Sequence, residues 1–227
     1  MSGYRHEYKY LLDAPAEALL RLRISAVMRR DPHTRADGTY LIRSVYFDDL
    51  RDTCLKDNIG GADPRSKYRI RYYNNSTDRI QLEKKSKVRG MCLKEACAIS
   101  REECRSLLRG GIPLPGAEAD GIKRRLFTEL RVKGLRPVNI VTYERIPFVY
   151  AAGNVRVTFD RNLTASAEIS RFLNGDYLQH PVFPPGQSLL EVKWDELIPA
   201  HLKRTLQTDG LLWTAFSKYS MCRLAQG

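Results

Sequence analysis

The sequence contains few of the residues that build disulfide frameworks or zinc sites. It has five cysteines in 227 residues, an odd number, and no Cys-x-x-Cys motif. Its four histidines do not form a His-Glu-x-x-His motif. Disulfide-rich domains and structural zinc sites depend on such spacings. The sequence therefore argues against both classes and favours a reducing compartment, so we expect a cytoplasmic protein.

Long apolar segments and blocks of like charge are missing as well. No window approaches the 18 or so apolar residues that a membrane-spanning helix requires. The first residues lack the apolar core of a signal peptide. Lysine and arginine are spread along the chain and do not form a basic tail or block. We therefore expect no transmembrane segment, and a folded basic site in place of a flexible basic arm.

A large excess of positive charge is present. The chain has 38 Lys and Arg against 26 Asp and Glu, which gives a formal net charge of +12. Such an excess predicts a polyanionic partner: nucleic acid, a phosphorylated small molecule, polyphosphate or an anionic membrane. Apolar residues make up 43% of the chain, enough for a sizeable core. No linker or tandem repeat divides the sequence, so we expect residues 1–227 to form a single domain.

Alternating residue types predict about eight strands, most of them joined by short turns. We expect strands near residues 4–11, 40–48, 66–74, 79–87, 91–99, 138–150, 155–161, 164–170 and 188–195. Helices are expected at 14–30, after the capping box of Ser100 and Glu103, at 122–133 and from Pro199 onwards. This order predicts an α+β fold: an eight-stranded antiparallel β-barrel with a charged lumen and helices packed on its outside.

The strand-like stretch 67–72, with the sequence KYRIRY, places three cations on one face and three apolar or aromatic side chains on the other. For a single strand, the simplest expectation is that the charged face contacts water. A Glu-x-Lys spacing, however, recurs three times, at Glu7/Lys9, Glu83/Lys85 and Glu191/Lys193. The apolar faces need helices to cover them, so we expect the charged faces to line the lumen. Mixed charges in a lumen are costly unless a ligand completes them, and a multiply charged anion with a divalent metal would do so.

Short motifs follow one another along nearly the whole chain. They are RHEYKY at 5–10, SVYFD at 44–48, KYRIRY at 67–72, LEKK at 82–85, YER at 143–145, RVTFD at 156–160, LEVK at 190–193 and SKY at 217–219. In this order they resemble the VTC domain, the polyphosphate polymerase domain of the triphosphate tunnel metalloenzyme (CYTH-like) superfamily. The resemblance implies a basic tunnel in which a metal-dependent ATP:polyphosphate phosphotransferase moves the γ-phosphoryl group of ATP to a growing polyphosphate chain.

The resemblance also implies roles for individual residues. Catalytic roles fall to Arg69, Arg71, Lys85 and Glu191, and Glu191 would also hold an Mn²⁺ or Mg²⁺ ion. Binding of ATP and of polyphosphate or pyrophosphate falls to Lys9, Arg43, Lys94, Arg145, Arg156, Lys193, Ser217 and Lys218. Glu83 and Lys193 are expected in the lumen, where they would form an internal pair.

One motif departs from the wider superfamily. Tunnel triphosphatases open with Glu-x-Glu-x-Lys, and here Arg5 stands at the first glutamate position. Fewer acids argue against a dedicated hydrolase. Two alternatives stay open: a tunnel triphosphatase with water as acceptor, and a non-catalytic polyphosphate-binding module with steep salt dependence. A nucleic-acid partner is not expected, because the basic residues alternate within strands and are not interleaved with solvent-facing aromatics.

Overall fold

The computed structural model describes residues 5–116, 119–207 and 210–226. These residues form one antiparallel sheet of ten strands, eight of which follow one another in the order β1-β10-β8-β7-β3-β4-β5-β6. The eight strands are β1 (His6–Leu12), β3 (Tyr40–Asp48), β4 (Arg65–Tyr73), β5 (Ser76–Val88), β6 (Met91–Ile99), β7 (Arg136–Tyr150), β8 (Val155–Ser166) and β10 (Ser188–Trp194). The short strands β2 (Arg29–Arg30) and β9 (His180–Pro181) pair with β7 and β8.

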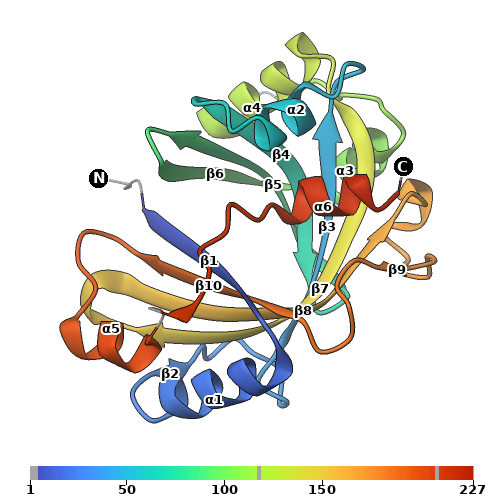
Figure 1. Ribbon diagram of the computed structural model, residues 1–227. Helices are drawn as coiled ribbons and strands as arrows, with labels where there is room; N and C mark the ends of the chain where they lie inside the picture. Colours follow the sequence, from blue (N-terminus) through green and yellow to red (C-terminus); the bar gives the residue numbers. More distant parts are fainter. Residues whose placement is uncertain (1–4, 117–118, 208–209, 227) are drawn as a thin grey trace.

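The sheet curls until its two edge strands, β1 and β6, approach each other (Figure 1). Arg5 and Cys92 join these edges through two backbone hydrogen bonds of 3.0 and 3.2 Å. Further along β1, Tyr10 pairs with Trp213 of the C-terminal segment. The predicted α+β fold with an eight-stranded antiparallel barrel is confirmed, and the barrel is nearly closed along a seam between β1 and β6.

Helices cover the outside of the curl in two groups (Figure 1). Helices α2 (Thr53–Ile59), α3 (Arg101–Leu108) and α4 (Gly121–Val132) contribute to the larger apolar core, around β3, β4 and β5. Helices α1 (Ala14–Ser25) and α5 (Ala200–Leu206) contribute to the smaller core, against β1, β8 and β10. Among the described residues, no helix combines the length and apolar character needed to cross a membrane.

Helix α6 (Lys218–Leu224) is the exception to the prediction that helices pack outside. It lies in the hollow of the curl, in front of β3 in Figure 1. The Tyr219 ring stacks on the inward-facing Tyr46 with ring centres 5.1 Å apart. The Tyr219 hydroxyl donates to Asp48, whose carboxylate also accepts from the backbone N–H groups of Cys54 and Leu55 at the start of α2. The SVYFD and SKY motifs therefore meet here and hold α6 in place.

Local signals explain several element boundaries. Ser100 Oγ accepts from the Glu103 backbone at 3.1 Å and the Glu103 carboxylate accepts from the Ser100 backbone at 2.7 Å, so the predicted capping box is confirmed. Helix α1 ends at Ser25, earlier than predicted, because Arg29 and Arg30 pair with β7 as β2. The strand predicted at 164–170 is instead the end of β8, which stops at residue 166. Helix α2 has no counterpart among the predicted elements.

Candidate functional site

A cavity of about 360 Å³ occupies the interior of the curl, beside α6. All of the eight main strands except β3 contribute a cation to its wall. Eleven basic side chains line it, namely Arg5, Lys9, Lys67, Arg69, Arg71, Lys85, Lys94, Arg145, Arg156, Lys193 and Lys218. Two carboxylates, those of Glu7 and Glu191, share the lining with them. Positive charge therefore dominates the lining, as the alternating strands predicted.

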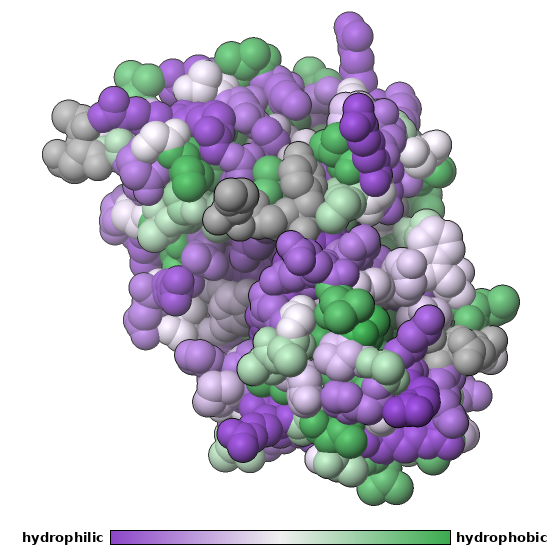
Figure 2. Space-filling view, turned by 90° about the vertical axis from the view of Figure 1, so that its left-hand side faces the viewer, coloured by the Kyte–Doolittle hydropathy of each residue, from purple (hydrophilic) through white to green (hydrophobic). Residues whose placement is uncertain are grey.

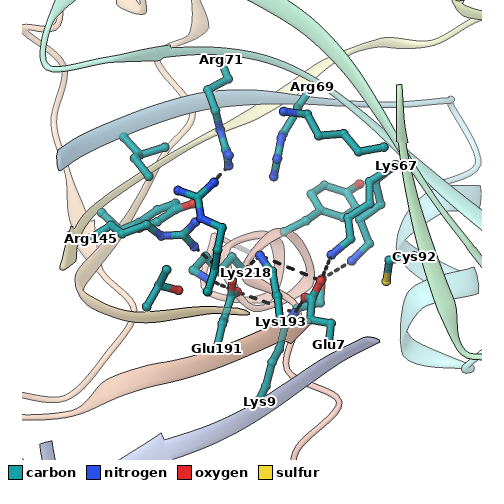
Figure 3. A pocket seen from close by; sticks show the side chains of 18 of the residues that line it. Glu7, Lys9, Lys67, Arg69, Arg71, Cys92, Arg145, Glu191, Lys193 and Lys218 are labelled. Atoms are coloured by element: carbon teal, nitrogen blue, oxygen red, sulfur yellow. Dashed lines mark hydrogen bonds and ion pairs between the residues drawn. The ribbon is translucent and has the colours of Figure 1, made fainter. Parts of the chain in front are cut away.

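Two arginines of β4 project into one side of the cavity (Figure 3). Arg69 is held by Glu83, with 2.7 Å from Nε and 2.6 Å from Nη2 to Glu83 Oε2, and it donates to the Tyr46 hydroxyl at 2.9 Å. Arg71 is held by hydroxyl groups, at 3.0 Å from Ser44 Oγ and 3.1 Å from the Tyr143 hydroxyl. Both guanidinium groups are therefore fixed in place before any ligand arrives, and Arg71 is fixed without a counter-charge in its hydrogen bonds.

Glu191 of β10 lies across the cavity from these arginines and is surrounded by cations (Figure 3). Its carboxylate lies 2.9 Å from Lys193 Nζ, 2.6 Å from Lys218 Nζ and 3.1 Å from Arg145 Nη2. Burial by itself would raise the pKa of Glu191, but Lys193, Lys218 and Arg145 outweigh it and hold the pKa well below its usual value. The Glu191 carboxylate is therefore ionised throughout the physiological range.

Asp160 of β8 contacts two of the cations that surround Glu191, namely Arg145 and Lys218. It is fully buried, accepts from Arg145 at 2.6 and 2.7 Å, and lies 2.6 Å from Lys218 Nζ. Burial disfavours the Lys218 ammonium, yet Asp160 and Glu191 together raise the pKa of Lys218 above its usual value. Asp160 was present in the RVTFD motif but was not predicted as a site residue, because spacing alone does not show which member of a motif pairs with which cation.

Glu7 of β1 forms a second anionic centre. Its carboxylate lies 2.5 Å from Lys85 Nζ, 3.1 Å from Lys9 Nζ and 4.0 Å from Lys193 Nζ. Burial would raise the pKa of Glu7, but these three lysines together hold it well below its usual value. Lys9 and Lys193 each contact both Glu7 and Glu191, so the two carboxylates belong to one network.

The donor set fits a divalent ion that protein and substrate would hold together. Magnesium-like ions are commonly bound by one or two carboxylates plus substrate phosphates. Glu7 and Glu191 supply such oxygens, joined through shared lysines. Among the described residues, no group of three or more His, Cys, Asp or Glu side chains gathers as a metal site. A cage built from protein ligands alone therefore does not fit these residues, whereas a site completed by phosphate oxygens does.

Lys67 is a cavity residue that the motif-based assignment did not include. It precedes Arg69 and Arg71 on the same face of β4, so the alternation of KYRIRY was the signal that could have identified it. Its ammonium donates to Ser217 Oγ at 2.8 Å. Burial lowers the pKa of Lys67 well below its usual value, and the nearby charges of Lys9, Lys85 and Arg65 lower it further.

The structure brings together all but one of the predicted site residues. The cavity is lined by Arg69, Arg71, Lys85, Glu191, Lys9, Lys94, Arg145, Arg156, Lys193, Ser217 and Lys218. Arg43 is the exception. Tyr40, Ile42 and Tyr46 of β3 face the cavity, so Arg43 at an odd position of the same strand faces the outer layer.

Arg43 is buried in that outer layer under the segment 169–177. Its guanidinium lies over the Tyr177 ring at 5.2 Å. Gly175, with φ of +79°, gives it room, since a Cβ at Gly175 would lie 1.8 Å from Arg43 Nη1. The expectation that Arg43 contacts phosphate in the lumen is therefore corrected: its cation fixes a covering loop and lies on the far side of the sheet.

The Glu-x-Lys pairs also differ from a simple side-by-side arrangement. Glu7 with Lys9 and Glu191 with Lys193 do form ion pairs of 3.1 and 2.9 Å. Glu83 instead binds Arg69 of β4 and Lys94 of β6, and so it forms no pair with Lys193. The acids join neighbouring strands to one another, which the spacing within one strand could not show.

Two arginines of the cavity lining, Arg5 and Arg156, pair with aspartates that are not part of it. On the face of the molecule seen in Figure 2, hydrophilic side chains surround a hollow. Arg156 lies 2.8 Å from Asp31 and is about two-fifths exposed, and Arg5 lies 2.7 Å from Asp195. Asp31 also accepts from the His33 backbone at 3.1 Å. Arg5, at the position where tunnel triphosphatases have a glutamate, therefore pairs with an aspartate outside the lining and adds a cation to the cavity wall.

Comparison with known proteins agrees with this geometry. The VTC domain family matches residues 4–225. Among curated proteins, none matches this chain. A proposed adenylate cyclase from Bacillus halodurans is 16% identical, with 91% of this chain and 89% of that chain covered and a TM-score of 0.50, which shows a shared fold. The PH1819 protein from Pyrococcus horikoshii OT3 is 15% identical, with 96% of this chain and 97% of that chain covered and a TM-score of 0.49. The Mimivirus capping enzyme triphosphatase is 11% identical, with 92% of this chain and 88% of that chain covered and a TM-score of 0.39.

Proposed function

Because this chain belongs to the VTC domain family of the triphosphate tunnel superfamily, we propose that it is a polyphosphate polymerase. It would transfer the γ-phosphoryl group of ATP to the end of an inorganic polyphosphate chain. The observation that carries the proposal is the cavity lining, in which eleven basic side chains face two carboxylates. A ligand with several adjacent negative charges would balance this lining, and a triphosphate or a longer phosphate chain has that form.

Positioning and charge neutralisation are the main tasks in phosphoryl transfer, since the protein itself need not form a covalent bond. Arg69 and Arg71 can each bind phosphate oxygens through two parallel N–H groups, a geometry that lysine does not offer. Their hydrogen bonds to Glu83, Tyr46, Ser44 and Tyr143 hold the guanidinium groups still. They are thus oriented toward the charge that develops in the transition state before the substrate binds.

The bond changes require no general base. An oxygen of the terminal phosphate of the chain attacks the γ-phosphorus of ATP, and the bond between that phosphorus and the bridging oxygen to the β-phosphate breaks. ADP leaves with the electron pair of the broken bond, and the polyphosphate chain is longer by one phosphate. The acceptor oxygen is already anionic, so the lysines Lys85, Lys193 and Lys218 serve to reduce repulsion between the two phosphate groups.

A divalent ion, Mn²⁺ or Mg²⁺, would complete the site. Glu191 would hold it, with Glu7 as the second nearby carboxylate, and substrate phosphates would supply further oxygens. When bound, such an ion would supply positive charge that offsets the negative charge of the phosphoryl groups. The cations around Glu191 would then turn to the phosphates that enter beside them.

The proposal is tested by one incubation of the protein with ATP and Mn²⁺. We expect long-chain polyphosphate, detected by a polyphosphate-binding dye and by gel mobility, together with stoichiometric ADP. Free orthophosphate without polymer would identify the triphosphatase alternative, and binding without turnover would identify a binding module. Either result would replace the polymerase assignment.

A pair of arginine variants tests where the reaction takes place. Arg69→Ala removes a preorganised donor in the cavity, and we expect polymer synthesis to fall by roughly 100-fold or more. Arg43→Ala removes a buried arginine from the opposite face of the neighbouring strand. It should lower the unfolding temperature while the folded fraction keeps its turnover. Wild-type synthesis in Arg69→Ala would contradict this placement.

A further inference from the structure

A second, smaller cavity of about 70 Å³ opens from the main one. The two share part of their walls, namely Glu7, Lys9, Lys67, Lys85, Cys92 and Ser217. Beyond these shared residues the smaller cavity, here called the side cavity, is lined by Asn58, Arg65, Lys87 and the segment 213–216. It lies between β1 and the starts of β4 and β6, where the barrel seam is bridged by residues Arg5 and Cys92 alone among the described edge pairs.

The side cavity contains like charges placed directly opposite each other. In the antiparallel register of β4 and β5, Arg65 faces Lys87 and Lys67 faces Lys85. All four side chains line the side cavity, so the charges share one face. Like charges in directly opposed cross-strand positions destabilise a sheet. Two such pairs in succession therefore cost folding stability unless an anion binds between them.

Only one of these four cations, Lys85, has a carboxylate partner. Lys85 has Glu7 at 2.5 Å. Arg65 donates to the backbone carbonyl of Ala62 at 2.6 Å, and Lys67 donates to the Ser217 hydroxyl. Within the described ranges, Arg65, Lys67 and Lys87 have no carboxylate at ion-pair distance. Elsewhere in the interior, Arg69, Arg145, Lys193 and Lys218 each have one or more.

The C-terminal segment closes the outer side of this cavity. The Thr214 backbone N–H donates to the Lys9 carbonyl at 2.9 Å, and Lys9 Nζ donates to the Phe216 carbonyl at 2.8 Å. The segment thus runs beside the free edge of β1 and leads to Ser217, the partner of Lys67. Basic side chains of β4 and β5 therefore line one side of the side cavity, and the segment 213–217 lines the other.

We propose that the side cavity is a second phosphate-binding site, in which Arg65, Lys67 and Lys87 hold phosphoryl groups of a chain whose other end lies in the main cavity. The nature of the chain rests on the proposed function. Because Lys67 and Ser217 line both cavities, one polyphosphate chain can pass from the main cavity into the side cavity. The cations that have no carboxylate partner would attract its phosphate groups. A ligand of three phosphates would be contained in the main cavity, whereas a longer polyphosphate would extend into the side cavity.

The test compares two ligands on one double variant. Arg65→Ala/Lys87→Ala should weaken binding of long-chain polyphosphate about tenfold, the effect of two phosphate contacts of modest strength. Binding of tripolyphosphate should stay unchanged. Calorimetric titration measures both affinities on the intact chain. Because the variant removes an opposed like-charge pair, its unfolding temperature without ligand should be equal to or above that of the wild type.

The matched control is Lys203→Ala/Arg204→Ala, which removes the same charge from α5, away from both cavities. It should leave both affinities unchanged. Equal losses for the two ligands in Arg65→Ala/Lys87→Ala, or no loss for the long chain, would overturn the proposal. So would binding of free orthophosphate that disappears in this variant while chain affinity is retained, since that result indicates a separate phosphate site.

These outcomes are independent of the polymerase assignment. If the wild type made no polymer from ATP, the proposed function would fail, and the difference between long and short chains in the binding titration would still decide on the side cavity. If the wild type made polymer and the variant bound both ligands normally, only the side-cavity proposal would fail.

Discussion

The two walls of the interior differ in how their cations are balanced. One wall, here called the paired wall, contains Lys9, Arg145, Lys193 and Lys218 around Glu7, Glu191 and Asp160. The other, here called the unpaired wall, contains Arg65, Lys67 and Lys87 at the side cavity together with Arg71. In the paired wall, the acids offset most of the positive charge. In the unpaired wall, the positive charge remains for a bound anion to offset.

This difference has a physical consequence for folding and for binding. Removing one partner from a buried ion pair leaves an uncompensated charge, which is strongly destabilising. The paired wall therefore contributes to a stable empty barrel. The unpaired wall lowers stability instead, because its like charges repel each other in a partly desolvated place. We infer that the paired wall holds the reacting groups in position. The unpaired wall binds phosphate, whose negative charge offsets that of its cations.

The largest expected effect comes from unbalancing the paired wall. Glu191→Gln leaves Lys193, Lys218 and Arg145 without one of their counter-charges, and we expect the free energy of unfolding to fall by about 3 kcal/mol. Urea unfolding followed by circular dichroism measures it. Added tripolyphosphate should restore more stability to this variant than to the wild type, because the ligand replaces the missing anion.

Glu144→Gln is the control for this change. Glu144 pairs with Arg161 at 3.2 Å on the partly exposed outer surface. Exposed pairs contribute little, so a loss below about 1 kcal/mol is expected. Equal losses in Glu144→Gln and Glu191→Gln would show that the two carboxylates do not differ in the way the structure indicates, and the contrast between the walls would not stand.

The sequence predicted the direction of the side chains better than their partners. Period-2 alternation placed the cations of β4 on one face, and the recurrent Glu-x-Lys spacing indicated that this face turns inward. Both follow from local geometry. Which acid binds which cation depends on strand order and register, and for that reason the pairing of Glu83 with Arg69 and Lys94 could not be predicted from spacing.

Arg43 shows a second limit of the sequence. It lies next to the SVYFD motif, but the motif has an inner and an outer face, and the face is set by which alternate residues of β3 point inward. Lys67 shows the converse, since the alternation of β4 placed it on the inward face although the motif-based assignment gave it no role. The side cavity and the position of the segment 213–217 depend on contacts between residues far apart in the sequence, which local sequence patterns do not predict.

Acid should weaken the paired wall specifically. The pKa values of Glu7 and Glu191 are held well below normal by their lysine partners. Their contribution to stability is therefore complete above the unfolded-state pKa of about 4.3, and it is lost as the pH falls through the lower folded-state values. Urea unfolding between pH 7 and pH 3 should show a steep fall in the wild type and a shallower one in Glu191→Gln. Parallel curves would contradict this assignment.

The smallest expected effect concerns the unpaired wall and the proton on Lys67. Burial, with help from Lys9, Lys85 and Arg65, lowers its pKa in the empty protein. Between that lowered pKa and the unfolded-state value of about 10.4, the unfolded chain binds more protons than the folded one, so this group's contribution to stability rises with pH in that window. A phosphate bound beside Lys67 favours the ammonium and raises the pKa, and binding should therefore take up protons.

Calorimetric titration of polyphosphate in buffers with different ionisation enthalpies measures this uptake. The wild type should take up more protons than Lys67→Arg, by a fraction of one proton per chain bound, because arginine keeps its charge in both states. Lys56→Arg, on the exterior helix α2, is the matched control and should equal the wild type. Affinity of the wild type should also fall toward alkaline pH, and Lys67→Arg should not share that fall. Identical uptake in wild type and Lys67→Arg would mean that Lys67 is already charged without ligand, and the unpaired wall would then lack the proton-linked binding inferred for it.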